Sequence, residues 1–340
     1  MKRLDFTRRR FLKNSAMAGT FGSTIVGMAG RAMAQDFPSR QMTAIVPFAP
    51  GGGTDRSVRL VTPTWARLLG ADDFMLDHKP GAGTLIAQNL MANAQHDAHT
   101  TVFTPAPYTA WLAELEPEAF QLEQVAWIGS YFQDPNVLLV PKDSPYDSIE
   151  QFLDAAANAS EPLTAAVSAP LSASHAATVV LRERAGVKLR IVPFDGGGPA
   201  RNAVAGGHVD CCMAPYWSAT NVYELTKALA IFWPQDPTED FWNAPPAQEL
   251  LPFDMPSLNE PYCAQISSQS AQDHPERYQR LIETFERTLL DPEFIEGADA
   301  QGLTPFVGFM GPEECKKWVK DYVELLAEFR ESMEADLEEM

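Results

Sequence analysis

One pattern occurs twice in this chain and constrains its fold more than any other feature. It is an apolar strand that ends in Pro-Phe, followed by three glycines and the start of a helix. The first copy covers residues 44–61, AIVPFAPGGGTDRSVRLV, and the second covers residues 189–204, LRIVPFDGGGPARNAV. After the first glycines, Val58, Val61 and Trp65 follow at helical spacing. The chain is therefore predicted to contain two similar strand–turn–helix units.

Each glycine turn precedes a helix start, where the first backbone N–H groups lack intrahelical partners. With no side chains in front of them, these donors and the positive end of the helix dipole form a pocket for a small anion. The pattern also fits a plain capping turn without a ligand, with Thr54 or Asp55 as the cap. Neither copy is a nucleotide-binding loop, because GxxxxGK[ST] and GxGxxG are both missing. The recurrence favours the anion-binding interpretation.

The rest of the chain alternates between strand-like and helical segments. Strands are expected at residues 44–46, 74–77, 101–104, 125–131, 137–140, 163–167 and 211–214, and helices at 56–69, 85–94, 108–114, 149–157, 200–205 and 312–340. Such alternation predicts an α/β fold of mostly parallel sheets flanked by helices. Ligands of these folds bind at the carboxyl ends of strands, where the glycine turns lie. We therefore expect two lobes whose glycine turns face each other across a cleft.

The first residues resemble a twin-arginine export signal. Residues 7–13, TRRRFLK, precede a small-residue apolar segment over residues 16–30 and an A-x-A cleavage site at residues 32–34. The apolar segment is too short and too rich in Gly, Ser and Thr to span a bilayer well. We expect a signal peptide over residues 1–34, cleavage after Ala34 and delivery to the periplasm.

The charge of the chain limits its partners. Residues 1–34 hold seven Lys or Arg and one Asp, so their removal lowers the formal charge from −19 to −25. A chain this acidic is not expected to bind nucleic acid or an anionic membrane surface. Any anionic ligand must be held by short-range donors, because the long-range field repels it.

Cysteine and histidine positions show no spacing of a metal site, and no metal is expected. Cys211 and Cys212 follow a strand-like segment and are expected to be buried free thiols. A disulfide between Cys263 and Cys315 is compatible with an oxidising compartment, and the sequence leaves it open.

Five segments, in their order along the chain, resemble the substrate-binding receptors of tripartite tricarboxylate transporters, the Bug-type family. They are VPFAPGGGTDRSVRLV, HKPGAGTLIAQNLMANAQHDAHT, SPYDSIEQFLDAA, the Ser/His turn of residues 168–175, and VPFDGGGPARNAVAGGHVD. The resemblance covers residues 43–210 and continues more weakly to about residue 330.

This resemblance implies a periplasmic two-lobe binding protein of the Venus flytrap type, with no cofactor and no catalytic residues. One lobe would comprise residues 36–131 and 236–340, and the other residues 132–235, with the ligand cleft between them. The ligand would be a small carboxylate. The partners would be the membrane permease subunits of a tripartite tricarboxylate-type transporter, and the receptor itself would be a monomer.

The resemblance also implies which residues hold the carboxylate, partly through ordered waters. They are Phe48, Ala49, Gly52, Gly53, Thr54 and Asp55 in the first turn, Phe194, Asp195, Gly196, Gly197, Gly198 and Pro199 in the second, and Ser168, Ser172, Ser174 and His175 in the serine turn. In the serine turn, residues 169–171 (Ala-Pro-Leu) depart from the family's glycine-richer segment. A bulkier loop there would narrow or redirect the pocket.

Four side chains near these turns have more than one interpretation. Asp195 suits a ligand ammonium group, but a role in bonding the turn's N–H groups is favoured. Arg201 suits a second ligand carboxylate, but a position facing solvent is favoured. His175 fits a ligand donor and a capping residue equally well. Asp55 is expected to serve the helix start, where a carboxylate complements the dipole.

Two rival functions belong to other classes. A twin-arginine-exported hydrolase would need a nucleophile such as Ser172 with His175, but no G-x-S-x-G elbow is present and their spacing suits capping. A ligand sensor for a membrane signalling protein needs the same hinge closure as a transport receptor. We therefore predict a carboxylate receptor, with the sensor as the alternative and the hydrolase less favoured.

Overall fold

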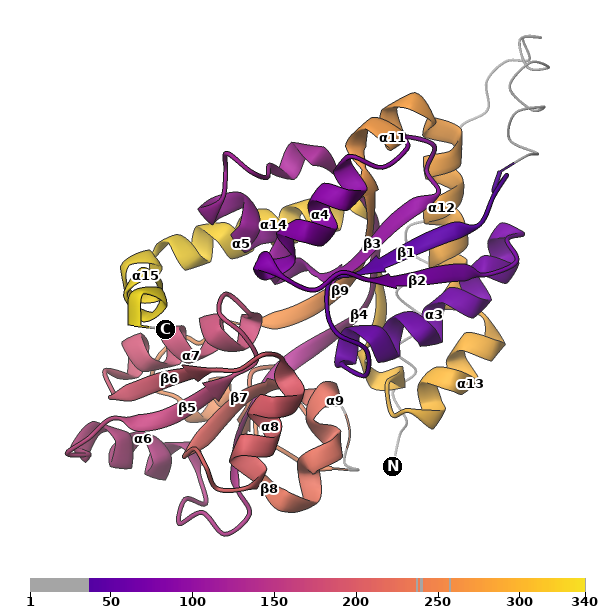
Figure 1. The fold of residues 1–340 in the computed structure, drawn as a ribbon. Coiled ribbons are helices and arrows are strands. Elements are labelled where there is room, and N and C mark those ends of the chain that lie inside the picture. Colours follow the sequence, from indigo (N-terminus) through magenta and orange to yellow (C-terminus); the bar gives the residue numbers. More distant parts are fainter. Residues whose placement is uncertain (1–36, 237, 239–240, 257, 340) are drawn as a thin grey trace, which may run out of the picture. The chain divides into compact units, whose positions relative to one another are not determined.

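The computed structural model describes residues 37–236, 238, 241–256 and 258–339 (Figure 1). Residues 38–340 form one compact unit, and all structural statements below concern it. The expected signal peptide and its cleavage site after Ala34 lie outside the described residues. Within the described part of the chain, no helix is long and apolar enough to cross a membrane.

The strands of this unit form a continuous mixed sheet in the order β2-β1-β3-β9-β4-β7-β5-β6, with β8 and β10 also paired to β4. Its strands are β1 (Met42–Val46), β2 (Phe74–His78), β3 (Thr100–Pro105), β4 (Val125–Pro141), β5 (Leu163–Val167), β6 (Leu189–Pro193), β7 (Cys211–Pro215), β8 (Thr226–Ile231), β9 (Asn259–Ser267) and β10 (Val307–Met310). We call β1, β2, β3, β9, β10 and the first half of β4 the β1 side. The second half of β4 with β5, β6, β7 and β8 is the β5 side.

Parallel and antiparallel pairs occupy different parts of the sheet. The outer strands are parallel: β1 pairs with β2 and β3, and β5 pairs with β6 and β7. The central strands β4 and β9 make antiparallel pairs. The expected parallel strand–turn–helix units are therefore present on both sides. The antiparallel pairs join them into one sheet.

The expected break between strands at residues 131 and 137 is wrong, because β4 runs unbroken for 17 residues. Asp134, Pro135 and Asn136, between the two expected runs, are part of the strand. Pro135 lies where β4 ends its pairing with β9 and begins its pairing with β7. β4 thus crosses the lobe boundary expected between residues 131 and 132, and the two-lobe division remains a prediction.

Helices cover both faces of the sheet (Figure 1). They are α3 (Gly53–Leu69), α4 (Leu85–Ala92), α5 (Ala106–Leu115), α6 (Ile149–Asn158), α7 (Ala173–Ala185), α8 (Gly197–Ala205), α9 (Tyr216–Ala219), α10 (Ala247–Leu250), α11 (Ser268–Asp273), α12 (Pro275–Thr288), α13 (Pro292–Ala300), α14 (Pro312–Ala327) and α15 (Arg330–Glu339). The expected C-terminal helix is thus two helices.

Aromatic rings hold α3 on the β1 side. Trp65 is fully buried and stacks on Phe74 at 4.8 Å between ring centroids. It also meets the edges of Phe103 and Phe285, from β3 and α12. The indole N–H of Trp65 donates to the Thr284 hydroxyl at 3.0 Å, so its polar atom is satisfied inside the core. This packing fixes α3 and therefore the first glycine turn at its N-terminus.

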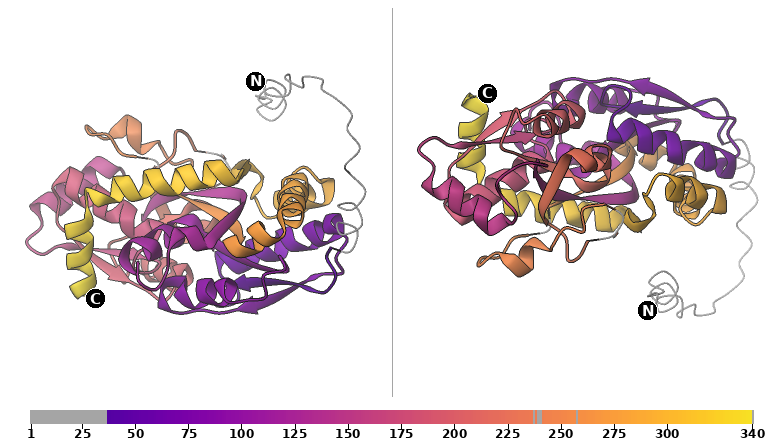
Figure 2. Two further views of the ribbon diagram at one scale, coloured as in Figure 1. Left: turned by 90° about the horizontal axis from the view of Figure 1, so that it is seen from above. Right: turned by 90° about the horizontal axis from the view of Figure 1, so that it is seen from below.

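The two C-terminal helices contact opposite sides of the sheet. α14 lies along α5 and β4, whereas α15 turns toward α7 (Figures 1 and 2). Asp336 in α15 accepts two hydrogen bonds from Arg182 in α7, at 2.8 and 3.0 Å. Such a bidentate pair ties the end of the chain to the β5 side.

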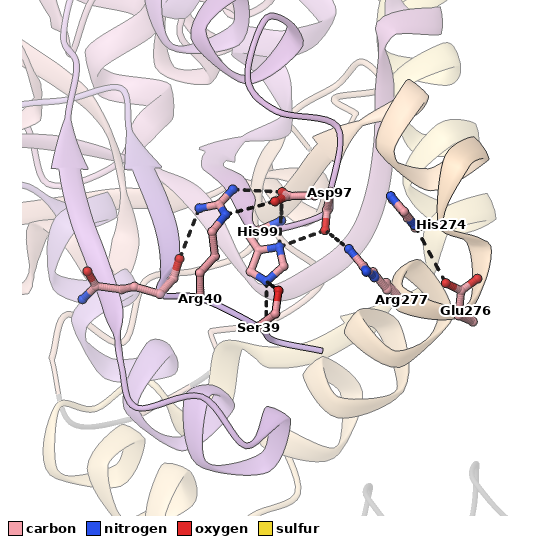
Figure 3. Close-up of polar contacts among 8 residues, drawn as sticks. Ser39, Arg40, Asp97, His99, His274, Glu276 and Arg277 are labelled. Carbon is pink, nitrogen blue, oxygen red and sulfur yellow. Dashed lines mark hydrogen bonds and ion pairs between the residues drawn. The ribbon is translucent and has the colours of Figure 1, made fainter. Parts of the chain in front are cut away.

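A second charged cluster fixes the start of β1 (Figure 3). Arg40 donates to both carboxylate oxygens of Asp97, at 2.9 and 3.0 Å. The Asp97 carbonyl accepts from Arg277 of α12 at 3.0 Å, and the backbone N–H of Ser39 donates to the buried His99 ring. The cluster lies at the amino end of β1, whereas the glycine turn lies at the carboxyl end. Its role is therefore structural.

Candidate functional site

The first glycine turn leaves the start of α3 without a side-chain cap. Gly52 occupies the N-cap position, and none of the described side chains bonds to the first helical N–H groups. Asp55 instead folds back and accepts from the Gly51 N–H at 2.8 Å. Burial would raise the pKa of Asp55, but hydrogen bonds from Arg59, Gly51 and His78 lower it. The expected helix-start role of Asp55 is confirmed, and its carboxylate is fully engaged.

The second glycine turn is joined to the serine turn by a backbone bond. Gly196 has a φ of 112°, which favours glycine, and its N–H donates to the Ser168 carbonyl at 2.8 Å. Gly196 is also the N-cap of α8, again without a side-chain cap. Asp195 and Pro199 are exposed to solvent. Pro199 is the third residue of α8, within the turn whose N–H groups lack intrahelical partners.

The serine turn is held by its own hydroxyl groups. Ser172 caps α7 and accepts from the His175 N–H at 3.1 Å, while Ser174 lies within hydrogen-bond distance of the Ser168 and Ser172 hydroxyls. Leu171 has a φ of 62°, a strained conformation for a residue with a side chain. The capping interpretation of Ser172 is confirmed. The bulkier loop is built into the turn at the cost of local strain.

His175 is a structural residue. Its ring is fully buried, and its Nδ1 accepts from the Leu171 N–H at 3.0 Å. The Nε2 atom lies 3.4 Å from the Asp336 carboxylate. Both ring nitrogens are therefore occupied. The ring bonds to neither Ser172 nor another described hydroxyl, so the geometry of a serine nucleophile with a histidine base is not formed.

The three turns meet near the middle of the sheet. A Cβ atom at Gly53 would lie 2.6 Å from the Ser218 hydroxyl and 3.3 Å from the Tyr262 hydroxyl. Phe48 of the first turn meets the edge of the Tyr108 ring at 5.1 Å, and the Tyr108 hydroxyl interacts with the serine turn. A Cβ atom at Gly197 would lie 2.5 Å from a terminal nitrogen of Arg201. Polar side chains thus lie close to the backbone of both glycine turns, Ser218 and Tyr262 at Gly53 and Arg201 at Gly197.

The expectation that Arg201 faces solvent is wrong. Its side chain is buried, and its Nε donates to the Asn221 side chain at 3.2 Å. Burial lowers the pKa of Arg201, while the nearby acidic groups, including Asp134, raise it. α8 begins at Gly197, three residues before the expected helix, and Arg201 lies on its buried face. Arg201 therefore brings a buried positive charge to the second turn.

Two buried acidic residues complete the site, and neither was predicted. Asp134 in β4 and Glu260 in β9 are direct partners in the antiparallel ladder. Burial raises the pKa of Asp134 to about 6, against hydrogen bonds from Trp217 and Ser218. Burial and the Asp134 charge raise the pKa of Glu260 to about 8. Residues 259–267, NEPYCAQIS, carry several polar side chains, so the sequence does not single out Glu260.

The site therefore combines uncapped helix starts, one buried arginine and two buried carboxyl groups. Backbone N–H groups and Arg201 suit an anionic group. In the described part of the chain, no cluster of His, Cys, Asp and Glu suits a metal ion. All four cysteines are buried free thiols, as expected for Cys211 and Cys212.

Two hollows lie elsewhere, between α5 and α14. One has a volume of about 10 Å³ beside Trp111 and Tyr322, which is room for a single water molecule. The other, of about 360 Å³, is an open surface groove that includes Glu123 and Lys320. Neither includes a glycine turn. Both hollows are therefore separate from the candidate site at the glycine turns.

A model of the family described as tripartite tricarboxylate transporter family receptor matches residues 58–324. A UPF0065 protein in the tcbD-tcbE intergenic region of Pseudomonas sp. (strain P51) is 33% identical over 206 residues, 60% of this chain and 59% of that relative. The match thus spans less than two thirds of that relative. Protein BugT of Bordetella pertussis is 26% identical over 317 residues, 91% of this chain and 94% of BugT.

Solved structures share the fold. The periplasmic binding protein BugD matches with a TM-score of 0.72 and 22% identity, over 86% of this chain and 98% of BugD. R. palustris Rpa4515 with adipate matches with a TM-score of 0.75 and 19% identity, over 88% of this chain and 98% of its own. MatC from Rhodopseudomonas palustris with bound malate matches with a TM-score of 0.68 and 23% identity, over 88% and 99%. The predicted α/β periplasmic-binding-protein fold is confirmed.

Proposed function

Because the chain belongs to the receptor family of tripartite tricarboxylate transporters, we propose that it captures a small organic carboxylate for such a transporter. Members of this family are periplasmic solute-binding receptors rather than enzymes. Two proteins of the same fold hold adipate and malate, which are both carboxylates. The twin-arginine signal of residues 1–34 would deliver this chain to the periplasm, where it would act as a monomer that delivers its ligand to membrane permease subunits.

One observation supports the position of the carboxylate. The starts of α3 and α8 have glycine at the N-cap, Gly52 and Gly196, and neither has a side-chain cap within the described residues. Their N–H groups are donors for an oxyanion, and the dipole of each helix favours negative charge there. The backbone amides around Gly53 and Gly197 would therefore hold the ligand carboxylate. The residues flanking these glycines and the serine turn would shape the pocket.

Domain closure would accompany binding. Residues 36–131 with 236–340 would form one lobe and residues 132–235 the other, and the two lobes would bend at the strands joining them. Pro135 lies where β4 changes partners, and a residue without a backbone N–H weakens the ladder there. The Gly53 turn on one side and Ser218 on the other would then separate to admit the ligand.

Thermal unfolding tests this proposal. The purified protein would be melted with C4 dicarboxylates, citrate, acidic amino acids, aromatic acids and simple monocarboxylates. A ligand that binds only the folded state raises the melting temperature, the midpoint of thermal unfolding. At one hundred times its Kd, it adds about 2.7 kcal/mol to the free energy of unfolding. We expect a concentration-dependent rise with one chemical class of carboxylate.

Uncharged analogues provide the control. The amide or alcohol of the same carbon skeleton should leave the midpoint unchanged, because it cannot use the helix-start donors as an oxyanion does. A well-folded protein whose midpoint moves with no carboxylate would contradict the proposed function. Equal shifts with the uncharged analogues would contradict the role of the helix starts.

A further inference from the structure

One carboxyl oxygen in the candidate site has no partner. Glu260 lies in β9 with 3% of its surface exposed. Its Oε2 accepts from the Tyr262 hydroxyl at 3.4 Å, while Oε1 is buried without a hydrogen bond to any described group. A buried polar atom without a partner is costly, and native proteins retain few of them. This oxygen therefore has hydrogen-bonding capacity that a ligand could use.

The groups around Glu260 come from several elements. They are Asp134 of β4, Arg201 of α8, Tyr262 of β9, Tyr108 of α5 and Tyr322 of α14, together with the backbone N–H of Ala173 at the start of α7. Asp134 is already satisfied, because its two oxygens accept from the Trp217 N–H, the Ser218 N–H and the Ser218 hydroxyl at 2.8–3.1 Å. Two carboxyl groups thus face one guanidinium.

The position of Glu260 ties it to the ligand. Its side chain approaches Ala173, the residue that follows the serine turn, and Tyr262 connects it to the close contact at Gly53. The unpartnered oxygen therefore lies among groups from both sides of the sheet, where the proposed carboxylate would bind. A ligand held at the glycine turns would come within reach of it.

We propose that Glu260 selects a carboxylate that also carries an ammonium group, so that the preferred ligands are amino acids rather than nitrogen-free dicarboxylates. This inference rests on the proposed function. The ligand carboxylate would use the helix-start N–H groups and Arg201, and its ammonium group would donate to the Oε1 atom of Glu260. The ligand would thereby give the Oε1 atom of Glu260 a hydrogen-bond partner and place a positive charge beside the two acidic residues.

Electrostatics gives the discrimination. A second ligand carboxylate would face the Asp134 charge in a buried site, where like charges repel strongly, and would be tolerated beside Glu260 only while that group keeps its proton. An ammonium group would instead form a charge-assisted hydrogen bond. Because burial and the Asp134 charge raise the pKa of Glu260 to about 8, ammonium binding at neutral pH should release a proton from it to solvent.

Matched ligand pairs test the inference. Isothermal titration calorimetry would compare L-aspartate with succinate, L-glutamate with glutarate, and L-alanine with propionate, since the members of each pair differ only in the ammonium group. For at least one pair we expect the amino acid to bind tenfold or more tightly than its nitrogen-free partner. In Glu260→Gln, which keeps the shape of the side chain, the two members of that pair should bind within about threefold of each other.

Two further variants locate the effect. Glu118→Gln makes the same change at an exposed residue outside the site and should keep the wild-type preference. Asp195→Asn tests the other acidic residue near the second turn. Loss of the preference in Asp195→Asn but not in Glu260→Gln would overturn the inference. Circular dichroism and thermal melting of each variant would show that it is folded.

The remaining outcomes separate this inference from the proposed function. If in every pair that binds the nitrogen-free acid binds as tightly as its amino acid, the receptor function stands and selection by Glu260 is overturned. A nitrogen-free acid could instead bind tightly below pH 8 and more weakly above it. This result would mean that protonated Glu260 donates a hydrogen bond to a ligand carboxylate, and it would also overturn the inference. If no carboxylate of either kind binds to the folded protein, the proposed function fails as well.

Discussion

Gly53 and Ser218 lie so close that a methyl group on Gly53 would come within 2.6 Å of the Ser218 hydroxyl. The two residues are 165 positions apart, and they belong to the first turn of α3 and to α9. Ser218 cannot easily move, because its N–H and hydroxyl both donate to Asp134. The absence of a side chain at residue 53 is therefore required by this tertiary contact.

Replacement of Gly53 by alanine tests this contact. We expect Gly53→Ala to weaken carboxylate binding at least tenfold, because the added methyl group separates the turn from Ser218. Overpacking of this kind typically costs about 1–3 kcal/mol of stability. Calorimetry and thermal melting would measure both effects. Gly308→Ala in β10 is the control, since a Cβ atom there meets nothing within 4 Å; equal effects in both variants would contradict the argument.

The buried acidic pair makes stability depend on pH. The pKa of Glu260 is about 8 in the folded protein, against an ordinary value of 4.5. The folded state therefore holds this proton more tightly, and the stability it gives is lost as pH rises from 4.5 to 8. Glu260→Gln removes this loss, so the ligand-free variant should gain stability relative to wild type over that window, by on the order of a few kcal/mol. Urea unfolding at several pH values measures it; a constant difference would contradict the raised pKa.

Asp134 and Glu260 should be energetically coupled. Asp134→Asn keeps one oxygen that can accept a hydrogen bond, but its NH2 group would face one of the present donors. The change should lower the free energy of unfolding by about 2–4 kcal/mol. In the background of Glu260→Gln the cost at pH 8 should be larger, because Asp134 no longer faces a second negative charge. A double-mutant cycle of urea unfolding measures the coupling. Additive effects would show that the two carboxyl groups do not interact.

Asp55 should stabilise the first turn. Asp55→Ala removes the acceptor for the Gly51 N–H and leaves Arg59 and His78 unpaired, with an expected loss of about 1–3 kcal/mol. Asp55→Asn keeps one acceptor and should lose less. Because the pKa of Asp55 is lowered from 3.8, its contribution is present above pH 3.8 and lost as the pH falls through its folded-state pKa. Unfolding curves at pH 7 and pH 3 would show this; a pH-independent loss would refute it.

Asp336 should hold α15 against α7. Asp336→Asn weakens the bidentate pair with Arg182 and should reduce stability by about 1–3 kcal/mol. In this variant, the backbone amides of α15 should exchange faster than in the wild type, whereas those of α14 should not. Glu338→Gln changes an exposed acid of the same helix and should do neither. Unchanged exchange in the Asp336 variant would mean that apolar packing alone holds the helix.

Much of the local structure could be predicted. The helix after the first turn, the strands around residues 74–77 and 163–167, and the cap at Ser172 follow from apolar spacing and turn residues, which act over a few positions. The wrong predictions concern segments whose structure depends on contacts with residues far away in the sequence. β4 reads as two strands, but β9 pairs with it up to Pro135 and β7 from Asn136.

The sequence by itself determined the two glycine turns, the alternation of strands and helices, and through them the receptor family. Tertiary structure decided which side chains surround the turns. Arg201 is buried by α8 packing, His175 is occupied by Asp336 from the end of the chain, and Glu260 meets Asp134 only through strand pairing. The physical reason is range: backbone preferences act within one helical turn, whereas charge, burial and hydrogen-bond satisfaction depend on groups that are over one hundred residues away.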